Sequence, residues 1–257
     1  SDVEGFTTLS EQIPPDEVSS ILNEYLSKMV QCIMQTKGTL DKFIGDAVMA
    51  LWNAPAAQEN HAALACETAL LMMKELNNLR GKWEKEERPL LNARIGINSG
   101  EMVVGNMGSK EIFDYTVLGS EVNTAARLEP LNKDFGTRII VSEATRVHAE
   151  KSCPEKFVFR CLARVVLKGR KNYLEVHELI DFRNDKDGTT FELIKQFEKG
   201  LDLFINAEFI EAKTFFQKAL EIKPDDEPSK IYISLCDYHK ENPPPEGWKG
   251  IYFQKSK

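Results

Sequence analysis

Apolar residues recur every three or four positions in two long stretches of the first half of the chain. In residues 15–37 the repeating positions are Val18, Ile21, Leu22, Tyr25, Leu26, Met29, Val30, Ile33 and Met34. In residues 60–87 they are Ala63, Ala65, Cys66, Ala69, Leu70, Met73, Leu76 and Leu79. This spacing follows the turn of an α-helix, so both stretches predict helices with a buried face. We expect Gly38 to end the first helix.

Short apolar runs predict strands around these helices. Residues 39–44 and 47–52 flank Gly45-Asp46, which predicts a β-hairpin whose turn presents a carboxylate. The other predicted elements are strands at 91–98, 101–105, 113–118, 138–141, 156–167 and 173–179, and a helix at 121–132. Helices that alternate with strands indicate an α+β sandwich with helices over one sheet.

A polar, glycine-containing stretch after residue 181 predicts a domain boundary. We expect a first domain at 1–181, a linker at 182–190, a small all-α helical segment at 191–241 and a proline-rich tail at 242–257. The residues that match the 34-residue tetratricopeptide (TPR) pattern are Gly200, Leu203, Ala212, Phe216, Ala219 and Pro224. One TPR-like unit cannot bury its own faces, so it either packs on the first domain or docks a partner. The residues expected to anchor the tail are Trp248, Tyr252 and Phe253.

Composition and charge narrow the classes of function. The 257 residues are 42% hydrophobic and 28% charged, which is ordinary for a globular protein with a sizeable core. The net charge of −7 argues against a nucleic-acid or anionic membrane surface, so a phosphate ligand would need local cations. The five cysteines have neither zinc-site nor disulfide spacing, which favours a reducing cytoplasm. No apolar run is long enough to span a bilayer, and we expect no membrane contact in these residues.

Two aspartates lie in apolar, glycine-containing surroundings. Asp2 belongs to Ser1-Asp2-Val3-Glu4-Gly5-Phe6-Thr7, and Asp46 ends Asp41-Lys42-Phe43-Ile44-Gly45-Asp46. Burying a carboxylate is costly unless a cation compensates it, so the pair suggests metal ligands. The residues after Gly5 lead into a helix whose first N–H groups could receive phosphate oxygens beside a metal. Either aspartate taken alone could equally be an ordinary turn residue.

Further motifs follow these two in a fixed order. They are Asn98-Ser99-Gly100 with Gly105-Asn106, then Asp114-Tyr115-Thr116-Val117-Leu118-Gly119, then Val122-Asn123-Thr124-Ala125-Ala126-Arg127-Leu128-Glu129. In this order the chain resembles the catalytic domain of the class III nucleotidyl cyclases over about residues 1–181. The resemblance implies a ferredoxin-like α/β sandwich. Family members carry an apolar strand directly before the first aspartate, so we expect this chain to be a fragment, a cytoplasmic domain whose parent could carry an upstream sensor and membrane anchors.

The resemblance also implies a reaction and its residues. The ribose 3′-oxygen of ATP would attack the α-phosphate, forming 3′,5′-cyclic AMP and pyrophosphate with the help of two divalent ions, Mg²⁺ or Mn²⁺. The implied metal ligands are Asp2, Asp46 and the carbonyl of Val3. The N–H groups implied to bind the β- and γ-phosphates are those of Gly5, Phe6 and Thr7.

Two residues on the helix after Gly119 complete the implied machinery. Asn123 and Arg127 are four positions apart and therefore share a helix face. The resemblance assigns Asn123 to the ribose and Arg127 to the charge that develops on the α-phosphate. Lys168 is implied as a further phosphate-binding residue, with Arg170, one alternate strand position away, as the other candidate.

Lys42 and Thr116 are implied to select the base. A lysine donates to adenine N1 and a threonine hydroxyl can pair with the N6 amino group, whereas guanine presents the opposite polarity. Guanylyl cyclases carry glutamate and cysteine at these positions. Adenylyl cyclases often carry aspartate at the second position, so threonine leaves the strictness of ATP selection open.

The metal-binding and base-binding residues imply a two-fold homodimer with two sites, each built from both copies. The leading expectation is a homodimeric adenylyl cyclase, and a guanylyl cyclase is the near alternative. A cyclase-like module without catalysis, which binds nucleotide or only dimerises, and a protein whose helical segment is the main functional element are further alternatives. His61, a lone histidine at the start of a predicted helix, is expected to cap or pack rather than take part in chemistry.

Overall fold

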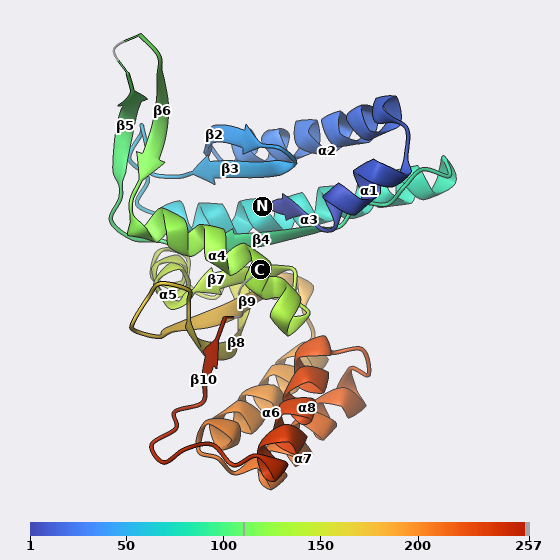
Figure 1. The fold of residues 1–257 in the computed structure, drawn as a ribbon, viewed down its shortest axis with the longest axis vertical. Helices are drawn as coiled ribbons and strands as arrows, with labels where there is room; N and C mark the ends of the chain where they lie inside the picture. Colours follow the sequence, from blue (N-terminus) through green and yellow to red (C-terminus); the bar gives the residue numbers. More distant parts are fainter. Residues whose placement is uncertain (110, 255–257) are drawn as a thin grey trace.

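The two helices with apolar faces lie side by side as α2 (Pro15–Gln35) and α3 (His61–Lys85) in the computed structural model, which describes residues 1–109 and 111–254 (Figure 1). A short helix, α1 (Phe6–Gln12), precedes them. α2 ends before Gly38, and Lys37 takes the left-handed conformation with φ 57°. Gly38 is required for another reason, because a Cβ there would lie 2.7 Å from the ring of Trp52.

A six-stranded sheet runs through the molecule in the order β1-β4-β7-β9-β8-β10. Its strands are β1 (Asp2–Val3), β4 (Ala93–Ile97), β7 (Ile139–Ser142), β8 (Phe157–Val166), β9 (Leu174–Phe182) and β10 (Ile251–Phe253). The predicted hairpin is formed by β2 (Thr39–Ile44) and β3 (Ala47–Leu51). Ser1 joins the hairpin to the sheet, because its backbone N and O both bond to Val48, at 2.8 and 2.9 Å. β1 therefore lies between β3 and β4.

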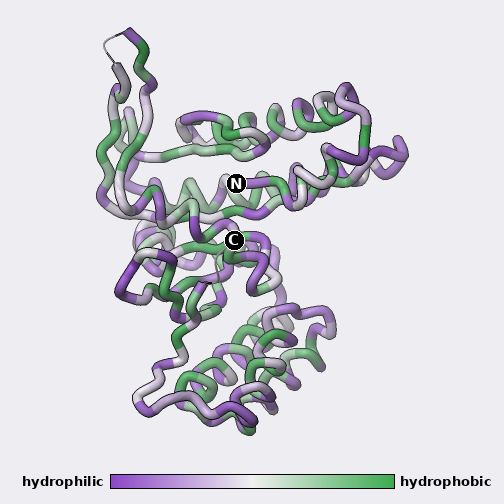
Figure 2. The backbone as a smooth tube through the Cα atoms, in the orientation of Figure 1, coloured by the Kyte–Doolittle hydropathy of each residue, from purple (hydrophilic) through white to green (hydrophobic). Residues whose placement is uncertain are grey.

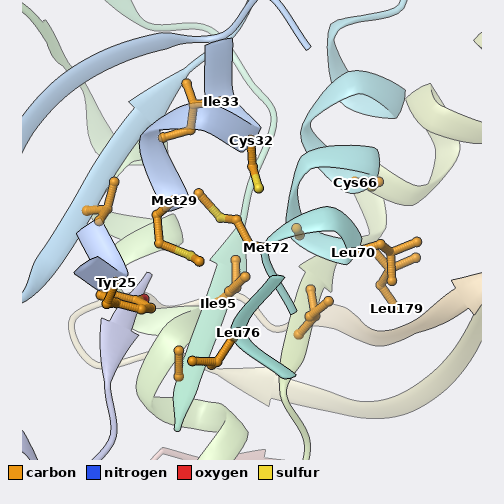
Figure 3. Close-up of a cluster of buried hydrophobic side chains, with 14 of the residues drawn as sticks. Tyr25, Met29, Cys32, Ile33, Cys66, Leu70, Met72, Leu76, Ile95 and Leu179 are labelled. Atoms are coloured by element: carbon orange, nitrogen blue, oxygen red, sulfur yellow. The ribbon is translucent and has the colours of Figure 1, made fainter. Parts of the chain in front are cut away.

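The main core fills the space between α2, α3 and the sheet. Figure 3 shows Tyr25 and Met29 of α2 facing Met72 and Leu76 of α3, with Ile95 of β4 beside them. Tyr25, Met29 and Leu76 are among the positions whose spacing predicts the two helices, but Met72 is not: it is buried where the sequence analysis expected its neighbour Met73, which is only partly buried. Burial of this shared face holds the N-terminal helices against the strands that carry the acidic motifs.

A second hairpin, β5 (Val103–Gly108) with β6 (Phe113–Leu118), projects away from the sheet (Figure 1). β6 has the predicted bounds, but β5 begins two residues later than expected. Hydrophobic stretches follow this arm in Figure 2, and its exposed large apolar side chains are Val103, Ile112, Phe113, Tyr115 and Leu118. In a single chain this apolar surface is uncovered.

Two helices follow the arm. α4 (Ser120–Phe135) runs past the predicted end at 132, even though Pro130 lies inside it. Gly96 lets this helix approach β4, because a Cβ there would lie 2.4 Å from the backbone N of Glu129. The sequence reasoning missed α5 (Glu143–Ser152), although Ser142 caps it by accepting a hydrogen bond from the N–H of Thr145.

The C-terminal part contains α6 (Gly188–Ile205), α7 (Phe209–Ile222) and α8 (Glu227–Glu241). The stretch expected as a linker, 182–190, is the end of β9, a 3₁₀ turn at Arg183–Asp185 and the first turn of α6, which Asp187 caps. α6 and α7 form a helix-turn-helix in which Gly200 leaves room for the Phe216 ring. The TPR-like assignment of this pair stays a prediction.

The proline-rich tail turns back and ends in the sheet. β10 pairs in parallel with β8, with Ile251 opposite Arg164. Trp248 packs against Phe204 and Phe209, and Tyr252 packs against Phe135. The expected anchoring role of Phe253 is wrong, because that side chain is exposed. In the described part of the chain, no helix has the length and apolar character needed to cross a membrane.

Candidate active site

The structure brings the two predicted acidic residues together. The N–H of Val3 lies 3.1 Å from Oδ1 of Asp2 and 3.2 Å from Oδ2 of Asp46. The pairing of Ser1 with Val48 sets this arrangement, and Gly45, with φ 64°, makes the turn that presents Asp46. Two carboxylates that are 44 residues apart in the sequence therefore share one backbone donor.

Electrostatics at this pair favour a bound cation. Burial, followed by the hydrogen bond with the carboxyl of Asp2, raises the pKa of Asp46 above its ordinary value. A divalent cation would relieve the repulsion between the two groups, and an all-oxygen ligand set fits Mg²⁺ or Mn²⁺. Val3, the third predicted ligand, is buried beside them.

The predicted phosphate-binding N–H groups lie just beyond the acidic pair. Gly5 takes the left-handed conformation with φ 67° and precedes α1, whose first two residues are Phe6 and Thr7. The first N–H groups of a helix have no acceptor within the helix, so these groups are available to an external oxygen. Gly5 and Thr7 are exposed and Phe6 is partly buried.

The predicted base-binding residues Lys42 and Thr116 both contact Asp41, a residue to which the sequence reasoning gave no role. Thr116 Oγ1 donates a hydrogen bond to Asp41 Oδ2 at 2.7 Å. Lys42 Nζ lies 3.4 Å from Asp41 Oδ1 and 3.9 Å from Asp114 Oδ2. The one signal in the sequence was the position of Asp41, a charged residue beside Lys42 in an otherwise apolar strand.

Asn123 and Arg127 lie on α4 as predicted. Asn123 is exposed, and Arg127 is partly buried. The guanidinium of Arg127 lies beside Gly169, where a Cβ would be 3.8 Å from both of its Nη atoms. The segment that carries Lys168 therefore approaches Arg127.

Lys168 and Arg170 do not occupy a strand, as the sequence reasoning expected, but a turn closed by a hydrogen bond from the N–H of Arg170 to the carbonyl of Leu167 at 2.9 Å. Arg170 already has partners, since its guanidinium lies 2.6 Å from Oε1 of Glu121. Lys168 is exposed, and within residues 1–109 and 111–254 no hydrogen bond or ion pair engages its ammonium. Lys168 is therefore the freer cation of the two.

Glu121 fixes the start of α4. Its carboxylate accepts hydrogen bonds from Asn98 Nδ2 at 2.9 Å and from Arg170. Although burial alone would raise the pKa of Glu121, these hydrogen bonds hold it below its ordinary value. The predicted Asn98 motif thus positions the helix that carries Asn123.

The predicted site residues form separate groups within one chain. In the described part of the sequence, no hydrogen bond or ion pair joins Asp2 or Asp46 to Lys42, Thr116 or Arg127. The acidic pair lies at β1 and the tip of the β2–β3 hairpin, whereas Thr116 lies on the projecting arm.

Two other clusters of chemical groups have structural explanations. His61 packs edge-on against His148 at 5.8 Å between ring centroids, and burial lowers its pKa, which agrees with the expected packing role. Glu143, Glu175 and His177 lie close enough to hold a metal ion. However, both carboxylates are already paired with arginines, Glu143 with Arg146 at 2.7 Å and Glu175 with Arg164 at 3.1 Å; we interpret this cluster as an ion-pair network.

Residues 1–180 match the family described as the adenylate and guanylate cyclase catalytic domain. The chain is 37% identical over 180 residues to adenylate cyclase 1 of Rhizobium meliloti, which covers 70% of this chain and 26% of that protein. It is 32% identical over 237 residues to the terminal-differentiation specific adenylate cyclase of Dictyostelium discoideum, which covers 92% of this chain and 11% of that protein. The second alignment therefore extends into the C-terminal helices.

Solved structures give the same likeness. The adenylyl cyclase CyaB from P. aeruginosa superposes with a TM-score of 0.65 and 32% identity, over 72% of this chain and 93% of that chain. The guanylyl cyclase Cya2 superposes with a TM-score of 0.61 and 31% identity, over 70% of this chain and 89% of that chain. The chain spans well under half the length of the two curated relatives but nearly all of these two solved domains.

Proposed function

Because this chain belongs to the family of adenylate and guanylate cyclase catalytic domains, we propose that it is an adenylyl cyclase that converts ATP into 3′,5′-cyclic AMP and pyrophosphate. The observation that carries the choice of ATP is the contact of Lys42 and Thr116 with the same carboxylate, Asp41. An ammonium group donates to adenine N1, and a hydroxyl oxygen can accept from the N6 amino group. Guanine presents an N1–H donor and an O6 acceptor, which oppose both groups.

The acidic pair would hold the divalent ions. Asp2 and Asp46 supply oxygen ligands side by side, and two bound ions would supply Lewis-acid stabilisation of the phosphate charge. The free N–H groups at Gly5, Phe6 and Thr7 would bind the β- and γ-phosphates close to this pair.

The residues of α4 and the neighbouring turn would act on the reacting groups. Asn123 would orient the ribose so that its 3′-oxygen lies in line with the α-phosphorus. Arg127 would place its guanidinium against the charge that builds on the α-phosphate in the transition state, where charge stabilisation contributes most to rate. Lys168, which is exposed and close to the segment beside Arg127, would add a second positive charge.

A homodimer would complete two equivalent sites. Within the described chain no hydrogen bond or ion pair joins the acidic pair to the groups that would bind base and ribose, so a second copy is the natural source of the missing half. The exposed apolar side chains of the β5–β6 arm support this pairing, because a partner would cover them.

Several finer expectations have support of different kinds. The spatial order β2-β3-β1-β4, with α2 and α3 packed against it, supports the ferredoxin-like sandwich.

A cytoplasmic location fits an ATP-consuming domain whose five cysteines are all free. The helical segment packs on the catalytic domain through the contacts of α6 with β8 and α8 with α4, which favours the packing role over partner docking.

Turnover of ATP and GTP by purified protein with Mg²⁺ or Mn²⁺ tests the proposal. We expect cyclic AMP as the main product. Predominant use of GTP would favour a guanylyl cyclase, the alternative supported by the likeness to Cya2. No cyclic product from either nucleotide, in protein that is folded and has been tested with both metals, would instead favour a module without catalysis.

A further inference from the structure

The hydroxyl proton of Thr116 is committed to a buried carboxylate. The side chain of Asp41 is 0% exposed, and its Oδ2 accepts the Thr116 hydrogen bond at 2.7 Å. A threonine hydroxyl has a single hydrogen, and an ionised carboxylate can only accept. While this bond persists, the Thr116 oxygen can offer a ligand only its remaining lone pairs.

A β-bulge explains how Asp41 reaches this position. Neighbouring residues of a regular strand point to opposite faces, so Asp41 and Lys42 would normally diverge. The pairing of β2 with β3 shifts register between Leu40 and Lys42, which leaves Asp41 as the extra residue. Bulges re-aim side chains, and here both Asp41 and Lys42 reach residues of β6.

The residue opposite Thr116 has no side chain. Gly105 lies directly opposite Thr116 in the β5–β6 hairpin, so an added side chain there would share the Thr116 face. A Cβ at Gly105 would have no heavy atom within 4 Å, apart from its own chain neighbours. The backbone of Gly105 therefore leaves open space on this face of the hairpin, opposite Thr116.

We propose that Asp41 determines base specificity by fixing the hydroxyl of Thr116 as a hydrogen-bond acceptor. The inference rests on the proposed cyclase function and identifies a positioning residue within it. Adenine presents an N6 amino donor to that oxygen, whereas guanine O6 would meet lone pairs and be repelled. Without Asp41 the hydroxyl could rotate and donate to O6. The contact of Asp41 Oδ1 with Lys42, at 3.4 Å, holds the second base-reading group in the same place.

The test is the ratio of kcat/KM for ATP to kcat/KM for GTP in Asp41→Asn. This variant keeps the shape of the side chain, but its amide can donate to the Thr116 oxygen and free the hydroxyl proton. We expect the ratio to fall about tenfold, the size of one hydrogen bond lost to one base and gained by the other. Asp41→Ala frees the hydroxyl in another way, and it serves if Asp41→Asn fails to fold.

Three variants separate this role from a structural one. Thr116→Ser retains a hydroxyl and should keep the ratio, whereas Thr116→Val should lose ATP use without gaining GTP use. Asp114→Asn removes the other carboxylate near Lys42. The side chain of Asp114 is 76% exposed and is not hydrogen-bonded to Thr116, so the ratio should stay within about twofold. Urea unfolding of each variant checks that the fold is retained.

Binding of uncleavable ATP and GTP analogues, measured by calorimetry, gives a readout that does not need catalysis. A parallel shift of the binding ratio in Asp41→Asn is expected. An unchanged ATP-to-GTP ratio in folded Asp41→Asn would overturn the proposed role of Asp41. Turnover of ATP by the wild-type protein would still support the cyclase function in that case. Absence of product from wild type, together with no binding of either analogue, would overturn both.

Discussion

At the scale of single residues, the candidate site depends on which charged groups already have partners. Arg170 is paired with Glu121, whereas Lys168 in the same turn has an exposed and free ammonium in the described part of the chain. A cation that is already paired gains less from a phosphate, because it must first give up its carboxylate. The two candidates of the sequence reasoning are therefore unequal in the folded protein.

Lys168→Ala should consequently reduce kcat/KM for ATP by roughly ten- to a hundredfold, through loss of a phosphate contact. Arg170→Ala should act less on phosphate binding and more on the start of α4, since it removes a partner of Glu121. Steady-state kinetics of both variants, with thermal unfolding as the check on folding, distinguish them. A larger kinetic loss in Arg170→Ala with unchanged stability would reverse the assignment.

At the scale of elements, a buried ion-pair network ties the helical segment to the sheet. Arg160 of β8 donates from Nη1 to both carboxylate oxygens of Asp226 at 2.9 Å and from Nε to Glu178 at 2.9 Å. Asp226 also caps α8 through the N–H of Ser229, at 3.2 Å. One carboxylate thus serves as a helix cap and as the partner of a buried arginine.

Asp226→Ala should therefore destabilise the protein by roughly 3 kcal/mol or more, since it leaves part of a buried guanidinium unpaired and removes a cap. Asp225→Ala is the matched control, because the neighbouring side chain is exposed and should cost no more than about 0.5 kcal/mol. Urea unfolding measures both. Equal small effects would mean that the network adds little to the joint between sheet and helices.

A second cluster joins α2 to the end of α3 and should make stability depend on pH. Glu24 accepts hydrogen bonds from Lys82, from Trp83 Nε1 at 2.9 Å and from Arg88 at 3.1 Å. These donors, with Lys82 first, hold the pKa of Glu24 below the ordinary value of 4.5. Because folding lowers the pKa of Glu24, the ionised side chain stabilises the folded state at pH values above 4.5, the pKa of an ordinary glutamate. This stabilisation is lost as the pH falls through the lowered pKa of the folded state.

Glu24→Gln should thus lower the free energy of unfolding by about 1 kcal/mol at pH 7, and the difference from wild type should shrink towards pH 3. Urea unfolding at both pH values measures this. Glu75→Gln, which removes a looser pair with Lys28 at 4.0 Å, should show little difference at either pH. A constant deficit for Glu24→Gln across this range would contradict the charge-based account.

At the scale of the whole molecule, the proposed homodimer with shared sites would make activity depend on assembly. Asp46→Asn and Arg127→Ala should each be inactive alone. In an equimolar mixture that has exchanged subunits, half of the dimers combine one copy of each, and one of their two sites is intact. We therefore expect about a quarter of the wild-type activity to return.

The control for this complementation is Asp46→Asn alone at the same total protein concentration, which should stay inactive. Specific activity of wild type should also rise with protein concentration, because a monomer would lack a complete site in the proposed arrangement. Failure of the mixture to recover activity after demonstrated subunit exchange would mean that one chain encloses the whole site.

Local patterns in the sequence determined much of the architecture. The spacing of apolar residues gave α2 and α3 to within two residues, since a helix repeats its environment every turn. The Gly45-Asp46 turn was predictable because φ above zero favours glycine. α5 was missed, although Ser142 signals its cap, because its mainly polar ten residues carry little apolar periodicity.

Only the tertiary structure decided what joins distant segments. Asp41 meets Thr116 across 75 positions, Arg160 meets Asp226 across 66, and β10 adds to the sheet beside β8 from the end of the chain. Such contacts depend on the path of the backbone and on one bulge, neither of which leaves a repeating pattern in the neighbouring residues. The resemblance identified Lys42 and Thr116 from the sequence. The contacts of both residues with the carboxylate of Asp41 became visible only in the three-dimensional arrangement of β2 and β6.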